Sequence, residues 1–135
     1  MCTSSTYLDP PKSPHDRPAA EILIPKPNSS FPTAYLYASN RNDPSPEGDS
    51  IAIFCIENPN TLELVGEFRT GLKHVRGMVF GGQDDRWLVV GGVKGGGVKV
   101  LERIDGGRHF KVASQNEDIK APSGFLWSVD INGQE

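Results

Sequence analysis

Residues 73–80 read Lys-His-Val-Arg-Gly-Met-Val-Phe, and residues 120–127 read Lys-Ala-Pro-Ser-Gly-Phe-Leu-Trp. The lysine, the glycine and three bulky apolar positions therefore recur at an offset of 47 residues. The same offset carries Ile-Ala-Ile-Phe at 51–54 onto Val-Lys-Val-Leu at 98–101. Two matches at one spacing, in the same order along the chain, indicate an internal structural repeat.

A third pair of related segments lies slightly further apart. Tyr-Leu-Tyr-Ala at 35–38 matches Trp-Leu-Val-Val at 87–90 at an offset of 52 residues. The longer connection at 42–49, which contains two prolines, accounts for the difference. A period of about 40–50 residues with four short strands in each unit is typical of a β-propeller blade. An ordinary antiparallel sandwich, in which the strands resemble one another by accident, is the alternative.

Short strand-like runs occupy most of the chain, and Gly, Pro, Asn or Asp bounds each of them, as turns require. With 15 Gly and 11 Pro among 135 residues, the chain has no room for a helix of three turns. We therefore predict an all-β protein. The predicted strands are 20–24, 34–39, 50–56, 62–68, 75–80, 86–91, 98–103 and 110–114.

These strands make about two four-stranded antiparallel β-propeller blades and the start of a third, an incomplete propeller. The predicted divisions are a disordered tail at 1–18 and a partial propeller at 19–135, with blades at about 19–69 and 74–114 and the inner strand of a further blade at about 122–129. A closed propeller needs at least about four blades, because closure protects the sheet edges. The chain is therefore expected to be a fragment or to associate.

Charge and composition exclude several classes of function. The 14 basic and 17 acidic residues are spread along the chain, so we expect neither a nucleic-acid partner nor a membrane partner. No apolar run has the roughly 20 residues of a membrane span, and no secretory signal is recognisable at the N-terminus. The expected location is cytoplasmic. The two cysteines lie far apart, and no metal-ligand spacing occurs, so we expect neither a metal nor another cofactor.

Several motifs, taken in order, resemble the late, carboxyl-terminal blades of the seven-bladed lactonase family. This family includes bacterial-type 6-phosphogluconolactonase and fungal 3-carboxy-cis,cis-muconate cyclase. The resemblance covers about residues 19–129, and its most specific part is the pair of runs at 35–41 and 49–54. The motifs are Ala-Glu-Ile at 20–22, Tyr-Leu-Tyr-Ala-Ser-Asn-Arg at 35–41, Asp-Ser-Ile-Ala-Ile-Phe at 49–54, the run 62–66 and Arg-Gly at 76–77.

The resemblance implies a propeller whose central channel opens into an active site for an anionic lactone or carboxylate. The chemistry is the opening or closing of a lactone ring without a metal or organic cofactor. Such a site needs cations that hold the anionic group and stabilise charge on the lactone oxygen. It also needs a group that transfers a proton.

Two arginines match the arginines of the family motifs. Arg41 ends the Ser-Asn-Arg run, for which the resemblance implies substrate binding; the alternative is an ion pair with Asp43 or Asp49. Arg76 matches the arginine of the family's Pro-Arg step, although Val75 replaces the proline here. We predict that both arginines take part in catalysis and substrate binding, and the alternative for Arg76 is an ordinary surface arginine.

Two further residues are candidates for the same site. Glu21, in the Ala-Glu-Ile run, is predicted to be catalytic, as a general base or as the partner that orients an arginine. His74 lies two residues before Arg76 and is predicted to contact substrate or transfer a proton; an incidental exposed histidine is the alternative. The glycine-rich segment 91–97 resembles a phosphate loop, but no helix follows it, so we interpret it as a flexible connection between strands.

The sequence leads to two hypotheses about function. In the first, the chain is the C-terminal part of a lactonase-like hydrolase or a carboxymuconate-cyclase-like isomerase and is inactive alone, because the earlier blades are absent. In the second, it is a non-catalytic interaction module that associates through exposed edge strands, with other chains or with copies of itself.

Overall fold

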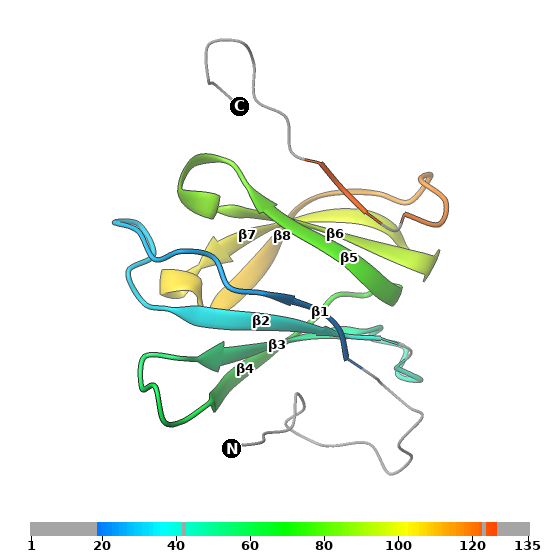
Figure 1. The fold of residues 1–135 in the computed structure, drawn as a ribbon. Coiled ribbons are helices and arrows are strands. Elements are labelled where there is room, and N and C mark those ends of the chain that lie inside the picture. The colour runs from blue at the N-terminus through cyan, green and yellow to red at the C-terminus, as the bar shows by residue number, and fades with distance from the viewer. Residues whose placement is uncertain (1–18, 42, 123, 127–135) are drawn as a thin grey trace.

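The computed structural model describes residues 19–41, 43–122 and 124–126, and eight strands in these ranges form two four-stranded antiparallel sheets (Figure 1). Sheet A has the order β1-β2-β3-β4: Ala19–Leu23, Tyr35–Asn40, Ser50–Cys55 and Glu63–Arg69. Sheet B has the order β5-β6-β7-β8: Lys73–Gly81, Trp87–Gly95, Gly97–Ile104 and His109–Asn116. The helical elements among the described residues are two 3-10 turns, η1 (Gln83–Asp85) and η2 (Asp105–Gly107). The prediction of an all-β chain with two four-stranded blades is confirmed.

The two sheets are copies of one unit, as the repeat in the sequence predicts. Strands β3 and β7 are the third strands of their sheets and carry the matches at 51–54 and 98–101. Strands β2 and β6 are the second strands of their sheets and carry the third match. Their offset is longer because the connection that follows β2 is longer than the connection that follows β6. Residues 41–49 join β2 to β3, whereas Gly96 alone joins β6 to β7.

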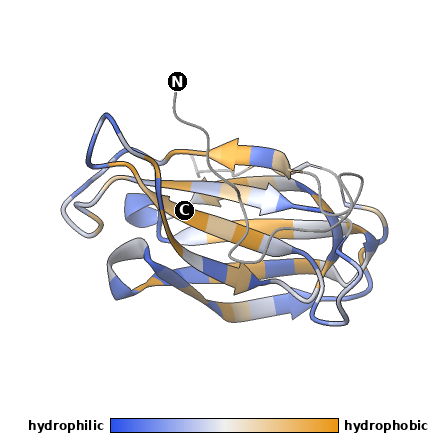
Figure 2. Cartoon of the chain, turned by 90° about the horizontal axis from the view of Figure 1, so that it is seen from below, coloured by the Kyte–Doolittle hydropathy of each residue, from blue (hydrophilic) through white to orange (hydrophobic). Residues whose placement is uncertain are grey.

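Apolar side chains fill the space between the two sheets. Tyr37 and Ile53 of sheet A face this space, as do Leu88 and Leu101 of sheet B, and all four are buried. Apolar positions recur in bands along the strands because successive side chains point to opposite faces of a sheet (Figure 2). The two sheets therefore pack face to face, as neighbouring blades do.

Sheet A is apolar on its other face as well. Ala38, Ala52 and Phe54 form a second buried cluster there, with Leu36 and Leu64 packed against it. A strand that is buried on both faces has a continuous apolar run rather than an alternating one. This explains why β3 reads Ser-Ile-Ala-Ile-Phe, with every one of these residues buried.

A buried arginine links the two sheets. The Tyr37 hydroxyl donates a hydrogen bond of 2.5 Å to the carbonyl of Gly107, and the Arg103 guanidinium donates one of 3.2 Å to the same hydroxyl. Arg103 is 2% exposed, and its guanidinium carbon lies 4.1 Å from the centroid of the Phe31 ring. Because aromatic faces attract cations, the rings around Arg103 stabilise its positive charge where water is excluded.

The interpretation of residues 91–97 as a flexible connection is wrong. Strand β6 continues to Gly95 and β7 begins at Gly97, so the segment is a tight hairpin. The glycines are needed because the backbones approach very closely. A Cβ on Gly92 would lie 2.1 Å from the carbonyl oxygen of Gly95, and one on Gly97 would lie 2.1 Å from that of Asn116.

Two predictions concern the ends of the chain. The predicted tail at 1–18 lies outside the described residues, and so does half of the predicted inner strand at 122–129, namely 123 and 127–129. Pro122 and residues 124–126 are described without a strand assignment. The side chains of Pro122 and Phe125 lie against Gly91, on sheet B. No helix in the described part of the chain has the length and apolar character required to cross a membrane.

Candidate functional site

Three connections meet at one end of the sheets, which we call the rim: the β2–β3 loop (41–49), the β4–β5 connection (70–72) and the β6–β7 turn at Gly96. This end lies on the right in Figure 1, where β5 begins and β6 ends. Gly71 donates a backbone hydrogen bond of 2.9 Å to Glu47 of the β2–β3 loop. A Cβ on Gly96 would lie 2.7 Å from the Leu72 side chain. The rim is therefore a packed surface that both sheets build.

The buried carboxylate of Asp49 holds the rim together. It accepts hydrogen bonds from the backbone N–H of Asp43, at 2.8 Å, and of Val75, at 2.9 Å. The backbone carbonyl of Asp49 accepts two more from Thr70, and its own N–H donates to Leu72. Asp49 thus joins the loop that follows Arg41 to the strand that carries His74 and Arg76.

Some of the cations at the rim have structural partners. Arg69 pairs with Asp43 at 2.6 Å and with Glu67 at 3.3 Å. Lys73 donates a hydrogen bond of 2.7 Å to the carbonyl of Ser45. Lys99 donates one of 2.7 Å to the carbonyl of Thr70. These three cations are therefore occupied in holding the connections.

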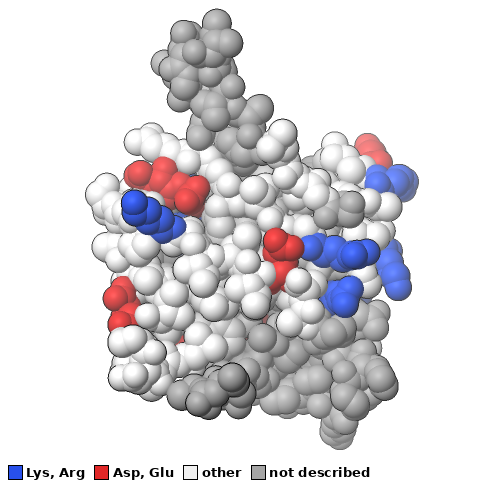
Figure 3. Space-filling model, in the orientation of Figure 1, with Lys and Arg blue, Asp and Glu red and all other residues white. Residues whose placement is uncertain are grey.

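Three other cations at the rim have no such partner. Within the described ranges, no ion pair or hydrogen bond engages the side chain of Arg41, Arg76 or Lys94. Arg41 has a buried Nε without a hydrogen-bond partner. The alternative role of Arg41 is not observed, because Asp43 pairs with Arg69 and Asp49 accepts backbone N–H groups. Figure 3 shows basic side chains gathered at this end of the molecule, on the right.

His74 lies among these cations in an irregular part of β5. Its φ of 60° is unusual for a residue other than glycine, and its Nδ1 is buried without a hydrogen-bond partner. Burial lowers the pKa of the imidazole, and the positive charges of Lys94, Arg41 and Arg76 lower it further, against an opposing effect of Asp49. Each of the three cations therefore lies close enough to His74 to interact with it electrostatically. At neutral pH the imidazole is mostly uncharged and is able to accept a proton.

The structure brings together three of the four predicted residues: Arg41, His74 and Arg76. Glu21 lies in β1, where the pairing with β2 shifts register, and its backbone N–H donates a hydrogen bond of 3.0 Å to Ser39. No ion pair joins the Glu21 carboxylate to a cation in the parts of the chain that the structure describes. The catalytic role of Glu21 stays a prediction.

Sequence reasoning missed Lys94. Its backbone lies opposite His74, because the register of β5 and β6 shifts between the pairs Lys73–Gly95 and Val75–Gly92. Two residues of β6 therefore stand against His74 alone, as in a β-bulge, and bulges often redirect side chains near active sites. The only signal in the sequence was a lysine inside the glycine-rich run.

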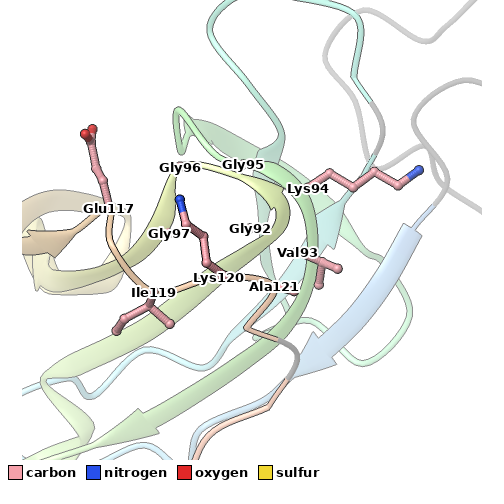
Figure 4. Close-up of a pocket in the computed structure, with 10 residues that line it drawn as sticks. All are labelled: Gly92, Val93, Lys94, Gly95, Gly96, Gly97, Glu117, Ile119, Lys120 and Ala121. Atoms are coloured by element: carbon pink, nitrogen blue, oxygen red, sulfur yellow. The ribbon is translucent and has the colours of Figure 1, made fainter.

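A cavity of about 320 Å³ lies beside the same hairpin and extends to residues 117–121 (Figure 4). Lys94 and Lys120 both line this cavity, and their side chains extend in opposite directions in the view of Figure 4. Among the described residues, no group of three or more His, Cys, Asp or Glu side chains could hold a metal ion.

Comparisons with known proteins identify the family. The family model described as lactonase, 7-bladed beta-propeller, matches residues 2–127. A solved structure of a candidate 6-phosphogluconolactonase from Bacteroides uniformis is similar, with a TM-score of 0.59 and 27% sequence identity. That match covers 78% of this chain but spans only 28% of the other protein's length. The comparison with curated proteins gave no match. The family model matches most of this chain, and the chain folds into two propeller blades. This chain therefore belongs to the lactonase family of seven-bladed β-propellers.

Proposed function

We propose that the rim binds an anionic lactone or the hydroxy-carboxylate formed from it, and that the chain supplies part of the active site of a propeller that opens or closes the lactone ring. One observation carries this proposal: Arg41, Arg76 and Lys94, which have no ion-pair partner among the residues that the structure describes, act electrostatically on a largely uncharged imidazole. Unpaired cations attract an anion, and a neutral imidazole accepts a proton, so the rim supports both binding and proton transfer.

Each side chain has a role in ring opening. The oxygen of a water molecule attacks the lactone carbonyl carbon, and His74 takes a proton from this water molecule. Arg41 and Arg76 stabilise the negative charge that forms on the carbonyl oxygen. The bond to the ring oxygen then breaks, and this oxygen receives the proton from His74, which leaves a hydroxy-acid. Ring closure is the reverse sequence. Glu21 is proposed to orient one of the arginines or to act as a second base.

The described blades are proposed to be the C-terminal part of such an enzyme. The solved relative is much longer than the matched part of this chain, which spans 28% of it. Other blades would complete the channel and add further groups to the site, so we expect the chain alone to bind ligand but to turn over little substrate. Location in the cytoplasm remains a prediction from the sequence.

Isothermal titration calorimetry with 6-phosphogluconate, the hydroxy-acid of a phosphorylated sugar lactone, tests the proposal. The wild-type chain should bind this ligand, and Arg41→Gln should weaken binding about tenfold or more, since a hydrogen bond to a charged group contributes about 1.5–3 kcal/mol. Arg108→Gln is the matched control, because Arg108 is exposed and follows the turn η2, away from the rim. Absence of binding at millimolar ligand would refute the proposed site.

The second candidate function is that of a non-catalytic interaction module. Strand β8 favours it, because it lies at the edge of sheet B with all but one of its residues exposed, and an exposed edge strand is a template for pairing with another chain. Sedimentation velocity tests whether copies of the chain associate. A discrete oligomer would support self-association, and a monomer at all concentrations would exclude it.

A further inference from the structure

We infer that Asp105 is a site of spontaneous covalent modification: in the folded chain it converts to isoaspartate, and this conversion loosens the link between the two sheets. The site lies in the turn η2, at the end of sheet B away from the rim (Figure 1). The reaction needs only water, because it takes place between the Asp105 side chain and the backbone of the next residue.

The reaction joins the side chain of Asp105 to the backbone of Gly106. The Gly106 nitrogen attacks the side-chain carboxyl carbon, a C–N bond forms, and the hydroxyl of the carboxylic acid leaves with the N–H proton as water. A second water molecule then opens the five-membered succinimide ring. When it attacks the main-chain carbonyl, the original peptide bond to Gly106 breaks and the main chain continues through the side-chain carbon. The product is isoaspartate, in which the former main-chain carbonyl is a free carboxylate.

The residue that follows Asp105 distinguishes it from the other aspartates. A side chain on the next residue hinders the attack, and Asp105 is the one aspartate in the sequence that precedes a glycine. Asp43 precedes Pro44, whose nitrogen has no proton to lose. Asp49 is completely buried, and its carboxylate oxygens already accept two backbone hydrogen bonds. Asp105 is therefore the aspartate from which the ring forms most readily.

The turn leaves the reacting groups room to approach each other. The Asp105 side chain is 68% exposed, and nothing lies within 4 Å of a Cβ added at Gly106. The carboxylate contacts His109 at 3.6 Å, and an exposed ion pair of this kind holds a side chain only weakly. Asp105, Gly106 and Gly107 have φ angles of 52°, 68° and 103°, a left-handed course that glycine adopts freely and aspartate tolerates. The carboxyl carbon and the Gly106 nitrogen can therefore meet through rotations within an exposed turn.

The same turn carries the buried link between the sheets. The Gly107 carbonyl accepts the hydrogen bond of 2.5 Å from the Tyr37 hydroxyl, and a Cβ added at Gly107 would lie 2.9 Å from that hydroxyl. The main-chain carbonyl of Asp105 accepts a hydrogen bond of 3.2 Å from the backbone N–H of Arg108, which closes the turn. Isoaspartate removes this carbonyl from the main chain and lengthens the main chain by one methylene. Because the contact with Tyr37 is too close to tolerate a shift of Gly107, we expect the link to be lost.

Incubation of the folded chain for several weeks in warm buffer at neutral pH, followed by trypsin digestion, tests the reaction. Isoaspartate leaves the mass of the peptide 104–108 unchanged but alters its chromatographic retention, and an isoaspartyl methyltransferase with S-adenosylmethionine labels it. The Asn132-Gly133 step can form the same product, but it lies in a separate peptide, 121–135. Wild type should accumulate the product at Asp105, and Asp105→Glu should lose it, because the longer side chain must close a larger ring. Formation of the product only in the urea-unfolded chain would overturn the inference.

Urea unfolding of the isomerised fraction tests the effect on the link. Its midpoint should fall by about 1 M relative to the unmodified chain, the shift expected when one buried hydrogen bond is lost at the usual slope. In Tyr37→Phe, which lacks this bond from the start, isomerisation should lower the midpoint by less, because both changes act on one contact. Asp105→Glu, incubated alongside, is the matched control and should keep its midpoint. An unchanged midpoint of the isomerised wild type, or an equal fall in Tyr37→Phe, would overturn the inference.

Discussion

Replacement of Asp49 by alanine is expected to destabilise the chain by about 3–6 kcal/mol. The side chain of Asp49 is completely buried and accepts hydrogen bonds from the backbone N–H of Asp43 and of Val75. Hydrogen bonds to a charged group contribute about 1.5–3 kcal/mol each, and the substitution leaves two buried donors without acceptors. Since a domain of this size is stable by only about 5–15 kcal/mol, the loss is a large part of the total.

Urea unfolding at fixed pH, followed by tryptophan fluorescence, measures this loss. With a slope of about 1–3 kcal/mol per molar urea, the midpoint for Asp49→Ala should fall by about 1 M or more. Asp49→Asn keeps one of the two acceptor oxygens, so we expect about half the loss. This variant also provides a value if the alanine variant is too unstable to fold.

Asp118→Ala is the control, because Asp118 is exposed and its side chain has no part in the rim. Its free energy of unfolding should lie within about 0.5 kcal/mol of the wild-type value. A loss below about 1 kcal/mol for Asp49→Ala would refute the reasoning, since it would mean that the two N–H groups find other acceptors, or water, at little cost.

Three further predictions concern other parts of the chain. Tyr37→Phe should cost about 1–3 kcal/mol in urea unfolding, because it leaves the buried carbonyl of Gly107 without its donor; an unchanged midpoint would contradict this. Gly97→Ala should prevent normal folding, because the added Cβ would lie 2.1 Å from a backbone oxygen of β8. Gly106→Ala, at a similar φ but with nothing within 4 Å of the added Cβ, should cost only about 1 kcal/mol of stability. Equal effects of the two substitutions on the melting temperature by circular dichroism would argue against the close contact. The pKa of His74, followed by NMR, should lie below 6.5, the ordinary value for histidine, because burial and nearby cations lower it. The unfolded chain then takes up the proton first, so the free energy of unfolding should fall as pH drops from 7 through 6.5, and by less in His74→Gln.

The strands were predictable from the sequence because their signals are local. Turn residues bound each apolar run, and the eight predicted runs overlap the eight strands of the structure. The β6–β7 hairpin was not predictable in the same way. A glycine gives flexibility or allows close contact depending on what lies across from it, and the oxygen that excludes a side chain at Gly97 belongs to Asn116 of another strand, β8.

The candidate site was predictable only in part. Arg41, His74 and Arg76 stand in or next to motifs that resemble those of the lactonase family, and the structure gathers these residues at the rim. Lys94 was missed because a register shift between two strands brings it to His74, and no motif marks such a shift. The link between Tyr37 and Arg103 spans 66 residues and pairs side chains that are each common in ordinary strands.

Asp49 and Tyr37 have a joint consequence for how the molecule opens. Asp49 connects the sheets at the rim, and the contact of Tyr37 with Gly107 connects them at the β7–β8 turn, towards the other end. Neither sheet can therefore swing away from the other without breaking a buried hydrogen bond at one end or the other. In native-state hydrogen exchange, the central amides of β2, β3, β6 and β7 should become exchangeable together, with one shared opening free energy, because the two blades form a single cooperative unit.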